Sequence, residues 1–202
     1  MVKATDVAYG RIQAPDLDKM EAYLTDFGMT RSARTETALY MRGTDSDHHI
    51  HVTHLGEEPK FLGMAFNVGS MEDLQALSTM DDVSEVEESD EPGGGYRVQM
   101  TDPDGYRVEA IYGMEQLDPL PLENAYIPNL GSERRRSGEL VRLEHGPCQV
   151  KRLGHVVIDV PDFKASDTFY QSHFNFLRSD QCYAGDDKDN IVVAFNRVDR
   201  GK

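Results

Sequence analysis

Apolar and polar residues alternate in short runs along the first hundred positions of the chain, and in two stretches the apolar residues instead recur every three to four positions. Alternation indicates half-buried strands, whereas the wider period indicates amphipathic helices. The pattern predicts that residues 9–24 and 63–78, which align at an offset of 54 (63 − 9), each form a strand leading into a helix. Asp16 and Ser70 are N-cap signals at the two helix starts.

Strand-like runs follow each predicted helix, at 38–41 and 50–52 in the first unit and at 96–100 and 106–112 in the second. Between the last two runs, Thr101-Asp102-Pro103-Asp104-Gly105 places Asp, Pro and Gly at positions of a type I turn, which predicts a hairpin. Glu109 then lies in the closing strand. Each unit therefore consists of a strand, a helix and further strands, and we predict the α+β class.

The start of this pattern occurs again near the end of the chain. Residues 153–163 repeat residues 7–17 at an offset of 146 (155 − 9), with His155 in the place of Tyr9. This copy predicts a strand that contains His155, a helix over 165–173 and a strand over 191–195. A duplicated strand that has gained an imidazole suggests that only the second copy has a metal site.

The stretch between the two copies has little periodicity and contains four prolines and three glycines, at positions 119, 121, 128 and 147 and at 131, 138 and 146. Such a stretch is typical of an extended linker. We therefore predict a first domain at 1–113, a linker at 114–150, and at 151–202 the first unit of a second domain that is incomplete within this chain. Without a fourth unit, we expect an unpaired strand edge and an exposed apolar face that includes Val157, Phe169 and Val193.

The composition of the chain narrows its function further. The 202 residues, 39% of them hydrophobic, suffice for an ordinary core, and the first residues lack the apolar run of a secretory signal, so we expect a soluble cytoplasmic protein. A net charge of −15 argues against nucleic acid or an anionic membrane as partner. The acidic run at 81–91 is typical of a solvated surface. Cys148 and Cys182 are too few for a disulfide framework and are interpreted as structural thiols.

Histidines supply the candidate metal chemistry. His155 is the candidate ligand, with a core histidine as the alternative interpretation. His48, His49, His51 and His54 form a second group, in which strand alternation places His49 and His51 on one face. No third well-placed ligand accompanies this pair, so we interpret these four as solvated strand histidines. His145 and His173 are interpreted as structural.

The paired strand-helix-strand units, the DPDG hairpin followed by a strand glutamate, and a Gly-His strand followed by Pro-Asp resemble the vicinal oxygen chelate superfamily, which includes glyoxalase I and bleomycin-resistance proteins. Within it, Pro119-Leu120-Pro121 and the segment LGHVVIDVPD are similar to type I extradiol catechol dioxygenases. The resemblance covers essentially the whole chain. It implies tandem βαβββ units that form paired-module domains with curved mixed sheets.

The resemblance also implies a function. Such dioxygenases hold Fe(II), occasionally Mn(II), with two histidines and one glutamate of the second domain, and His155 matches the first histidine. The other two ligands and an acid/base histidine would lie beyond residue 202, so this chain departs from the full pattern and is expected to be inactive alone. The implied partners are a catechol-type aromatic diol and O2, and we expect a homo-oligomer.

In the first domain, the positions that correspond to the metal ligands are Tyr9, Gly63 and Glu109. Only the glutamate could bind a metal, so the resemblance implies a metal-free first domain. Glu109 is therefore interpreted as a locally hydrogen-bonded carboxylate.

Two other function classes stay open at this point. The chain could be a binding module that holds a small apolar ligand in its first domain without a metal. It could also belong to a glyoxalase- or epimerase-type isomerase that uses Zn, Ni or Co. Metal-independent binding would favour the module, and catalysis without oxygen consumption would favour the isomerase.

Overall fold

The computed structural model describes residues 2–122 and 146–199. Most of the first domain is one mixed sheet in the order β2-β3-β4-β1-β5-β8-β7-β6. Its strands are β1 (Ala4–Ala14), β2 (Thr30–Arg34), β3 (Ala38–Arg42), β4 (His51–Leu55), β5 (Lys60–Val68), β6 (Glu87–Glu88), β7 (Tyr96–Thr101) and β8 (Arg107–Tyr112). The helices α1 (Leu17–Phe27) and α2 (Met71–Leu77) follow β1 and β5. The observed α+β class and the two similar units agree with the prediction.

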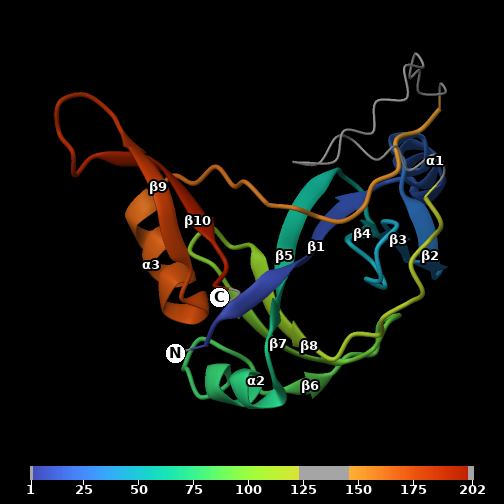
Figure 1. The fold of residues 1–202 in the computed structure, drawn as a ribbon, viewed down its shortest axis with the longest axis horizontal. Coiled ribbons are helices and arrows are strands. Elements are labelled where there is room, and N and C mark those ends of the chain that lie inside the picture. The colour runs from blue at the N-terminus through green and yellow to red at the C-terminus, as the bar shows by residue number, and fades with distance from the viewer. Residues whose placement is uncertain (1, 123–145, 200–202) are drawn as a thin grey trace, which may run out of the picture.

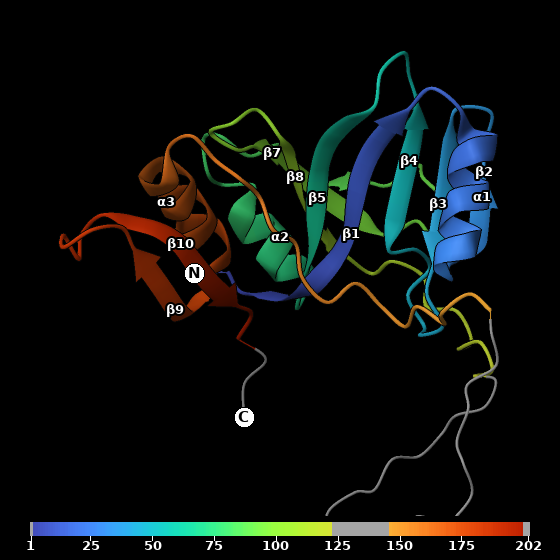
Figure 2. The same cartoon turned by 90° about the horizontal axis from the view of Figure 1, so that it is seen from above.

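The two units join at the centre of the sheet. β1 and β5 pair antiparallel there, while β1 pairs parallel with β4 and β5 pairs parallel with β8. The sheet curves strongly, with β2 and β3 at one end and β7 and β8 at the other (Figures 1 and 2). Apolar side chains of the strands cover the outer face, leucine and methionine under α1 and mainly valine, methionine and phenylalanine under α2. They gather on this face because strand residues alternate between the two faces. The strand side chains that do not face the helices point to the inner face of the sheet.

Local signals in the sequence set the helix starts and the hairpin as predicted. The Asp16 carboxylate accepts a hydrogen bond from Lys19 N at 3.0 Å, and the Ser70 hydroxyl accepts one from Asp73 N at 3.2 Å. The turn between β7 and β8 closes with a hydrogen bond from Gly105 N to Asp102 O at 3.0 Å.

The third unit packs directly on the first domain. It contains α3 (Phe163–Phe174), β9 (Leu177–Tyr183) and β10 (Ile191–Arg197), and its two strands form a separate antiparallel sheet. The ring of Phe174 lies 4.8 Å from that of Phe66 on β5, centroid to centroid. The Tyr170 hydroxyl donates a hydrogen bond to the Asp102 carboxylate at 2.8 Å. The predicted helix and the second predicted strand are thus confirmed, and α3 lies beside α2 on the outer face of the sheet (Figure 1).

This packing changes the predicted apolar face of the third unit. Val157 and Val193 are exposed, as expected, but Phe169 is buried, so its assignment to the exposed face is wrong. The reason is that α3 turns Phe169 into the core of the first domain, where it joins Tyr170 and Phe174. Much of the hydrophobic surface that the third unit carries is therefore covered within the chain.

The predicted strand around His155 does not form. Residues 151–160 run as an extended segment (Figure 1) but pair with no strand in the part of the chain that the structure describes. Val156 and Ile158 pack against the first-domain core, whereas His155 and Val157 are exposed. Alternate side chains of this segment therefore point to the core and to the surface, as in a strand. The segment is held by the packing of its apolar side chains and not by backbone pairing in a sheet.

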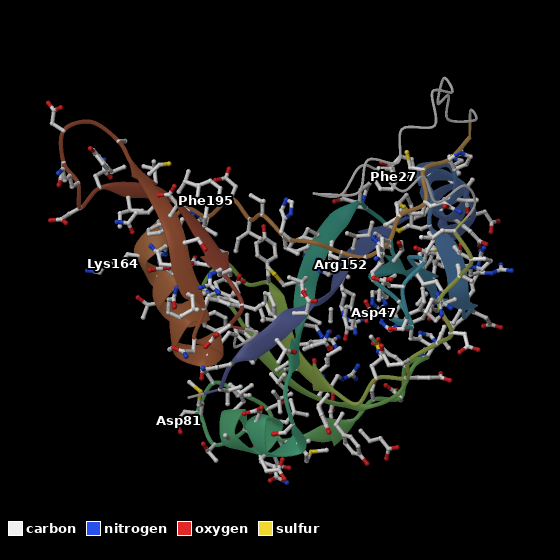
Figure 3. The ribbon with its side chains drawn as sticks, in the orientation of Figure 1. Phe27, Asp47, Asp81, Arg152, Lys164 and Phe195 are labelled. Atoms are coloured by element: carbon white, nitrogen blue, oxygen red, sulfur yellow. The ribbon has the colours of Figure 1, made fainter. Side chains whose placement is uncertain are left out.

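Both described ends of the predicted linker contact the loop between β3 and β4. Leu120 N donates to Thr44 O at 2.9 Å, and Thr44 N donates to Val150 O at 2.8 Å. Arg152 then lies 3.6 Å from the carboxylate of Asp6 on β1. Figure 3 shows Arg152 and Asp47 lying near each other beside the middle of the sheet. The linker thus begins and ends against the same loop. His145 lies outside the described residues.

Within residues 2–122 and 146–199, no helix is long and apolar enough to cross a membrane.

Candidate functional site

The inner face of the sheet is centred on a buried arginine. Arg11 is 1% exposed and lies on β1 two positions after Tyr9, so both side chains point to the same face. Its Nε donates to Glu109 Oε2 at 2.6 Å, and its Nη2 donates to Glu91 Oε2 at 2.7 Å and to the Tyr9 hydroxyl at 3.2 Å. Its Nη1 lies 3.0 Å from His54 Nε2. The guanidinium thus joins β1, β4, β8 and the loop before β7.

Two further arginines surround the same carboxylates. Arg107 Nη2 donates to Glu109 Oε1 at 2.5 Å, and Arg97 Nη1 lies 3.2 Å from Glu91 Oε1. Arg97 Nε also donates to Glu87 at 2.7 Å. We call the group formed by Arg11, Arg97, Arg107, Glu87, Asp90, Glu91 and Glu109 the charged cluster. Buried charges need partners of this kind, because an unpaired ion in the interior is very costly.

The charges and burial at the cluster shift the pKa values of its members. Burial, together with the negative charge of Glu109, raises the pKa of Tyr9, so its phenol stays protonated and donates to the Glu109 carboxylate at 3.1 Å. Burial raises the pKa of Glu91, but the hydrogen bond from Arg11 and the positive charges of Arg11, Arg97 and Arg107 together outweigh burial, so the net pKa is lowered. Burial and the nearby Glu91 raise the pKa of Tyr40 to about 12. The cluster is therefore a network of fixed charges around protonated phenols.

His54 belongs to this network as a neutral imidazole. The Arg11 guanidinium has only donors, so His54 Nε2 must accept the hydrogen bond and carry no proton. Burial, followed by the positive charge of Arg11, lowers the pKa of His54. Its lone pair is thereby directed at the guanidinium.

Of the histidines in the 48–54 segment, His48 and His49 are buried, so their interpretation as solvated strand histidines is wrong, whereas His51 and His54 are half-buried. His48 and His49 are 7% and 2% exposed, and their Nδ1 atoms lie 3.0 Å apart. The His49 ring lies between those of Tyr9 and Tyr40, with centroids at 4.7 and 5.1 Å. The segment is buried because the loop that carries it is held by both described ends of the linker.

Lowering the pH is expected to destabilise the fold through His49 and His51. Mainly because of burial, their folded pKa values are lowered from 6.5 to about 3 and about 4. The unfolded chain therefore binds protons below pH 6.5 that the folded chain refuses, so stability present above pH 6.5 is lost as the pH falls toward 4. Each histidine should remove about 1.4 kcal/mol per pH unit well below pH 6.5.

Urea unfolding between pH 7.5 and 4.5 measures this loss. A His49→Gln variant is the control, because it removes one titrating group and should show a shallower decrease of unfolding free energy with pH. The same slope in both proteins would contradict the assignment of the loss to His49.

The structure does not bring metal ligands together. Among the described residues, no group of three His, Cys, Asp or Glu side chains could hold a metal ion. His155 is exposed and lies in the unpaired segment before α3. It therefore stays a predicted ligand. The described residues on their own do not fit Fe(II), and we derive no reaction step through a metal.

Three positions of the first domain correspond to the metal ligands of the resemblance. Tyr9 and Glu109 lie in contact, and the third position, Gly63, has no room for a side chain. Gly63 has a φ of 152°, and a Cβ there would lie 1.8 Å from Arg107 O, so no side chain fits. Glu109 is hydrogen-bonded as interpreted, but its partners include Arg11, which is distant in sequence.

Sequence reasoning did not identify Arg11 or Glu91 as site residues. The sequence held one signal for Arg11. It stands two positions after Tyr9 in a predicted strand, so the two side chains must lie on the same face of the sheet. Glu91 gave no such signal, since it lies in an acidic run that is typical of solvated surface. Its role depends on how the loop folds onto the sheet.

The fold of the chain is similar to those of several solved structures. The chain is similar to a Mn(II)-bound glyoxalase from Novosphingobium aromaticivorans, with 20% identity and a TM-score of 0.73 over 98% of this chain and 59% of the other. It is similar to a variant of homoprotocatechuate 2,3-dioxygenase from B. fuscum, with 21% identity and a TM-score of 0.70 over 96% and 51%. It is also similar to BphC, a halotolerant catechol dioxygenase, with 18% identity and a TM-score of 0.64 over 91% and 59%.

The chain thus spans between 51% and 59% of these three structures, and at such identities the likeness shows the fold. No curated protein gives a significant sequence match. The family model of the Glyoxalase/Bleomycin resistance protein/Dioxygenase superfamily matches residues 6–110, which is more than half of the chain and includes β1 to β8 except for their outermost residues. The chain belongs to the Glyoxalase/Bleomycin resistance protein/Dioxygenase superfamily.

Proposed function

We propose that this chain supplies the first domain, and the first unit of the second domain, of an enzyme that opens the ring of a catechol-type diol with O2. The observation that carries the proposal is the extent of the likeness to two dioxygenases. It covers 96% and 91% of the chain, so it includes the third unit as well as the first domain. The part of the chain that the repeat marks as the start of a catalytic domain thus has a counterpart in both.

In this proposal the first domain positions the third unit. Tyr170 and Phe174 attach α3 to the hairpin turn and to β5, and the segment with His155 leads directly into that helix. A divalent metal, Fe(II) or Mn(II), would supply the chemistry that activates diol and oxygen. His155 would be one of its ligands, and the other ligands would come from a further βαβββ unit.

A metal-dependent isomerase of the glyoxalase kind is the second candidate. The observation that favours it is the likeness to the Mn(II)-bound glyoxalase, whose TM-score of 0.73 exceeds the 0.70 and 0.64 of the two dioxygenases. The two candidates differ in a measurable way, because only ring cleavage consumes O2.

Oxygen uptake together with ring-opening absorbance tests the proposal. The 202-residue chain and the longest in-frame product of its encoding DNA are each loaded with Fe(II) under anaerobic conditions and given simple and aryl-substituted catechols. We expect oxygen uptake and ring cleavage in a product that contains a further βαβββ unit, and none in the 202-residue chain.

A His155→Ala variant of the longer product is the control and should lose bound iron as well as activity. Turnover of glyoxalase-type substrates without oxygen uptake would replace the proposal with the isomerase. An encoding DNA that stops after codon 202, with no activity in the purified chain, would overturn it.

A further inference from the structure

One of the two acids that contact Arg11 comes from a loop and not from the sheet. The loop joins β6 to β7, covers residues 89–95 and has the sequence SDEPGGG. Its Glu91 side chain reaches the inner face of the sheet and is 17% exposed there. Pro92 supplies the only apolar side chain of the loop, so hydrophobic burial does little to hold it. The contacts of Glu91 are therefore a principal attachment of the 89–95 loop to the sheet.

The position that Glu91 occupies suits a carboxylate group. Arg11 Nη2 donates to one oxygen, Oε2, at 2.7 Å, and Arg97 Nη1 lies 3.2 Å from the other, Oε1. Each oxygen thus faces a different guanidinium. Apart from Glu91, the ions at this position that are at least nine-tenths buried are Arg11, Arg97 and Glu109, with a formal charge of +1 (2 − 1). We call the place between the two guanidiniums the carboxylate position, because one anion is needed there.

Glu91 fills the carboxylate position incompletely. Arg97 is 9% exposed, and its Nη1 has no hydrogen-bond partner among the described residues, so its contact with Glu91 is ionic only. Buried donors in native structures are almost always paired. A free carboxylate is not held by a loop backbone and can align with both guanidiniums, which adds a charge-assisted hydrogen bond that Glu91 does not make.

The 89–95 loop is built as a unit that can leave the sheet. Hydrogen bonds from Ser89 N to Gly95 O at 2.8 Å and from Gly94 N to Glu91 O at 2.9 Å close the loop on itself. Residues 93–95 have φ values of 92°, 53° and 88°, which glycine adopts without strain. These internal bonds and turns do not depend on contact with the sheet, so the loop keeps them when it moves.

We propose that Arg11 and Arg97 form a binding site for a small-molecule carboxylate on the inner face of the first domain, and that Glu91 is a tethered competitor that closes this site. The carboxylate of the ligand takes the place of Glu91, and the 89–95 loop moves away from the sheet. Opening breaks the contacts of Glu91, which the ligand replaces, and the hydrogen bond that Gly93 O accepts at 2.8 Å. This inference does not depend on the proposed activity.

Titration with sodium acetate, followed by the NMR shifts and hydrogen exchange of the backbone amides, tests the proposal. In the unchanged chain, acetate should shift the amides of residues 89–95 and accelerate their exchange, because the loop leaves the sheet. Glu91→Ala removes the competitor and should bind acetate at least about tenfold more tightly than the unchanged chain. Glu91→Gln keeps the size of the side chain without its charge, and it should show a gain in the same direction.

Three controls separate this site from a general effect of charge. E88A removes an exposed carboxylate from the same acidic run and should gain no affinity. E91A/R97A should lose the gained affinity, since one of the two guanidiniums is absent. Sodium chloride at the same ionic strength should leave the amides of residues 89–95 unshifted, because it screens charges without supplying a carboxylate.

Four outcomes would overturn the proposal. One is a folded E91A protein that binds acetate no better than the unchanged chain. Another is an equal gain in E88A, which would make charge alone the cause. The third is saturation of E91A by acetate with no response of the 89–95 loop in the unchanged chain, which would make Glu91 a fixed structural partner. The fourth is that E91A and E91Q are both unfolded and stay unfolded in acetate.

Discussion

Substituting Glu109 with alanine is expected to lower the free energy of unfolding by about 3–5 kcal/mol, because it removes a fully buried carboxylate and leaves the buried Arg11 guanidinium with a single charged partner. Glu109 is fully buried and accepts hydrogen bonds from Arg11, Arg107 and Tyr9. Arg11 is buried equally deeply and would retain only Glu91 as a charged partner. Urea unfolding at pH 7.5 measures the loss. A Glu36→Ala variant, which removes an exposed carboxylate, should change the unfolding free energy by less than about 0.5 kcal/mol.

A double-mutant cycle with Arg11→Ala separates this cause from a general loss of packing. Each single variant takes one charged partner away from a buried ion, whereas the double variant removes both charges of the pair. We therefore expect the double variant to be destabilised by clearly less than the sum of the two single variants. Simple additivity would show that Glu109 and Arg11 do not act as a pair.

The first domain could be predicted from the sequence because its signals are local. Asp16 and Ser70 cap the helices on which the pattern placed them, and the turn at 101–105 forms the predicted hairpin. The offset of 54 between the units also gives two strands the same role, since β1 and β5 pair at the centre of the sheet. The curvature of the sheet was expected only from the family resemblance, because the local patterns do not specify it or show which side chains it encloses.

The enclosed inner face determines which side chains of the site are buried. It therefore explains why the interpretations of the histidines and of the acidic run were wrong. His48 and His49 look like strand histidines that water could reach, but their loop is held by segments near residues 120 and 150. Glu91 lies in an acidic run, yet its loop brings it onto Arg11. Both outcomes depend on contacts between residues that are distant in the chain, which hydrophobic periodicity does not register.

In the third unit, the predicted helix forms but the first predicted strand does not. Asp162 caps α3 by accepting from Ala165 N at 3.0 Å, so the helix forms as the repeat predicted. The segment 151–160 has the alternation of a strand but no partner strand among the described residues, and it packs by its side chains instead. A strand needs a neighbour for its backbone groups, whereas a helix satisfies its own.

The attachment of the third unit can be tested at Phe174. This ring is 1% exposed and lies 4.8 Å from Phe66 and 5.7 Å from Phe176, centroid to centroid. Phe174→Ala is expected to lower the free energy of unfolding by about 3–5 kcal/mol, because it removes a buried ring and leaves a cavity between α3 and β5. Because the cavity lies where α3 meets the sheet, amide exchange should accelerate most in α3 and much less in β1.

Phe195 provides the matched control, since it is also a phenylalanine of the third unit but is 54% exposed on β10 (Figure 3). Phe195→Ala should change the unfolding free energy by less than about 0.5 kcal/mol. Tyr170→Phe tests the polar part of the attachment and should cost about 1 kcal/mol, because the buried Asp102 carboxylate loses a donor. If Phe174→Ala and Phe195→Ala had equal effects, α3 would not be attached through this aromatic contact. The first domain could then not be what positions the segment that carries His155.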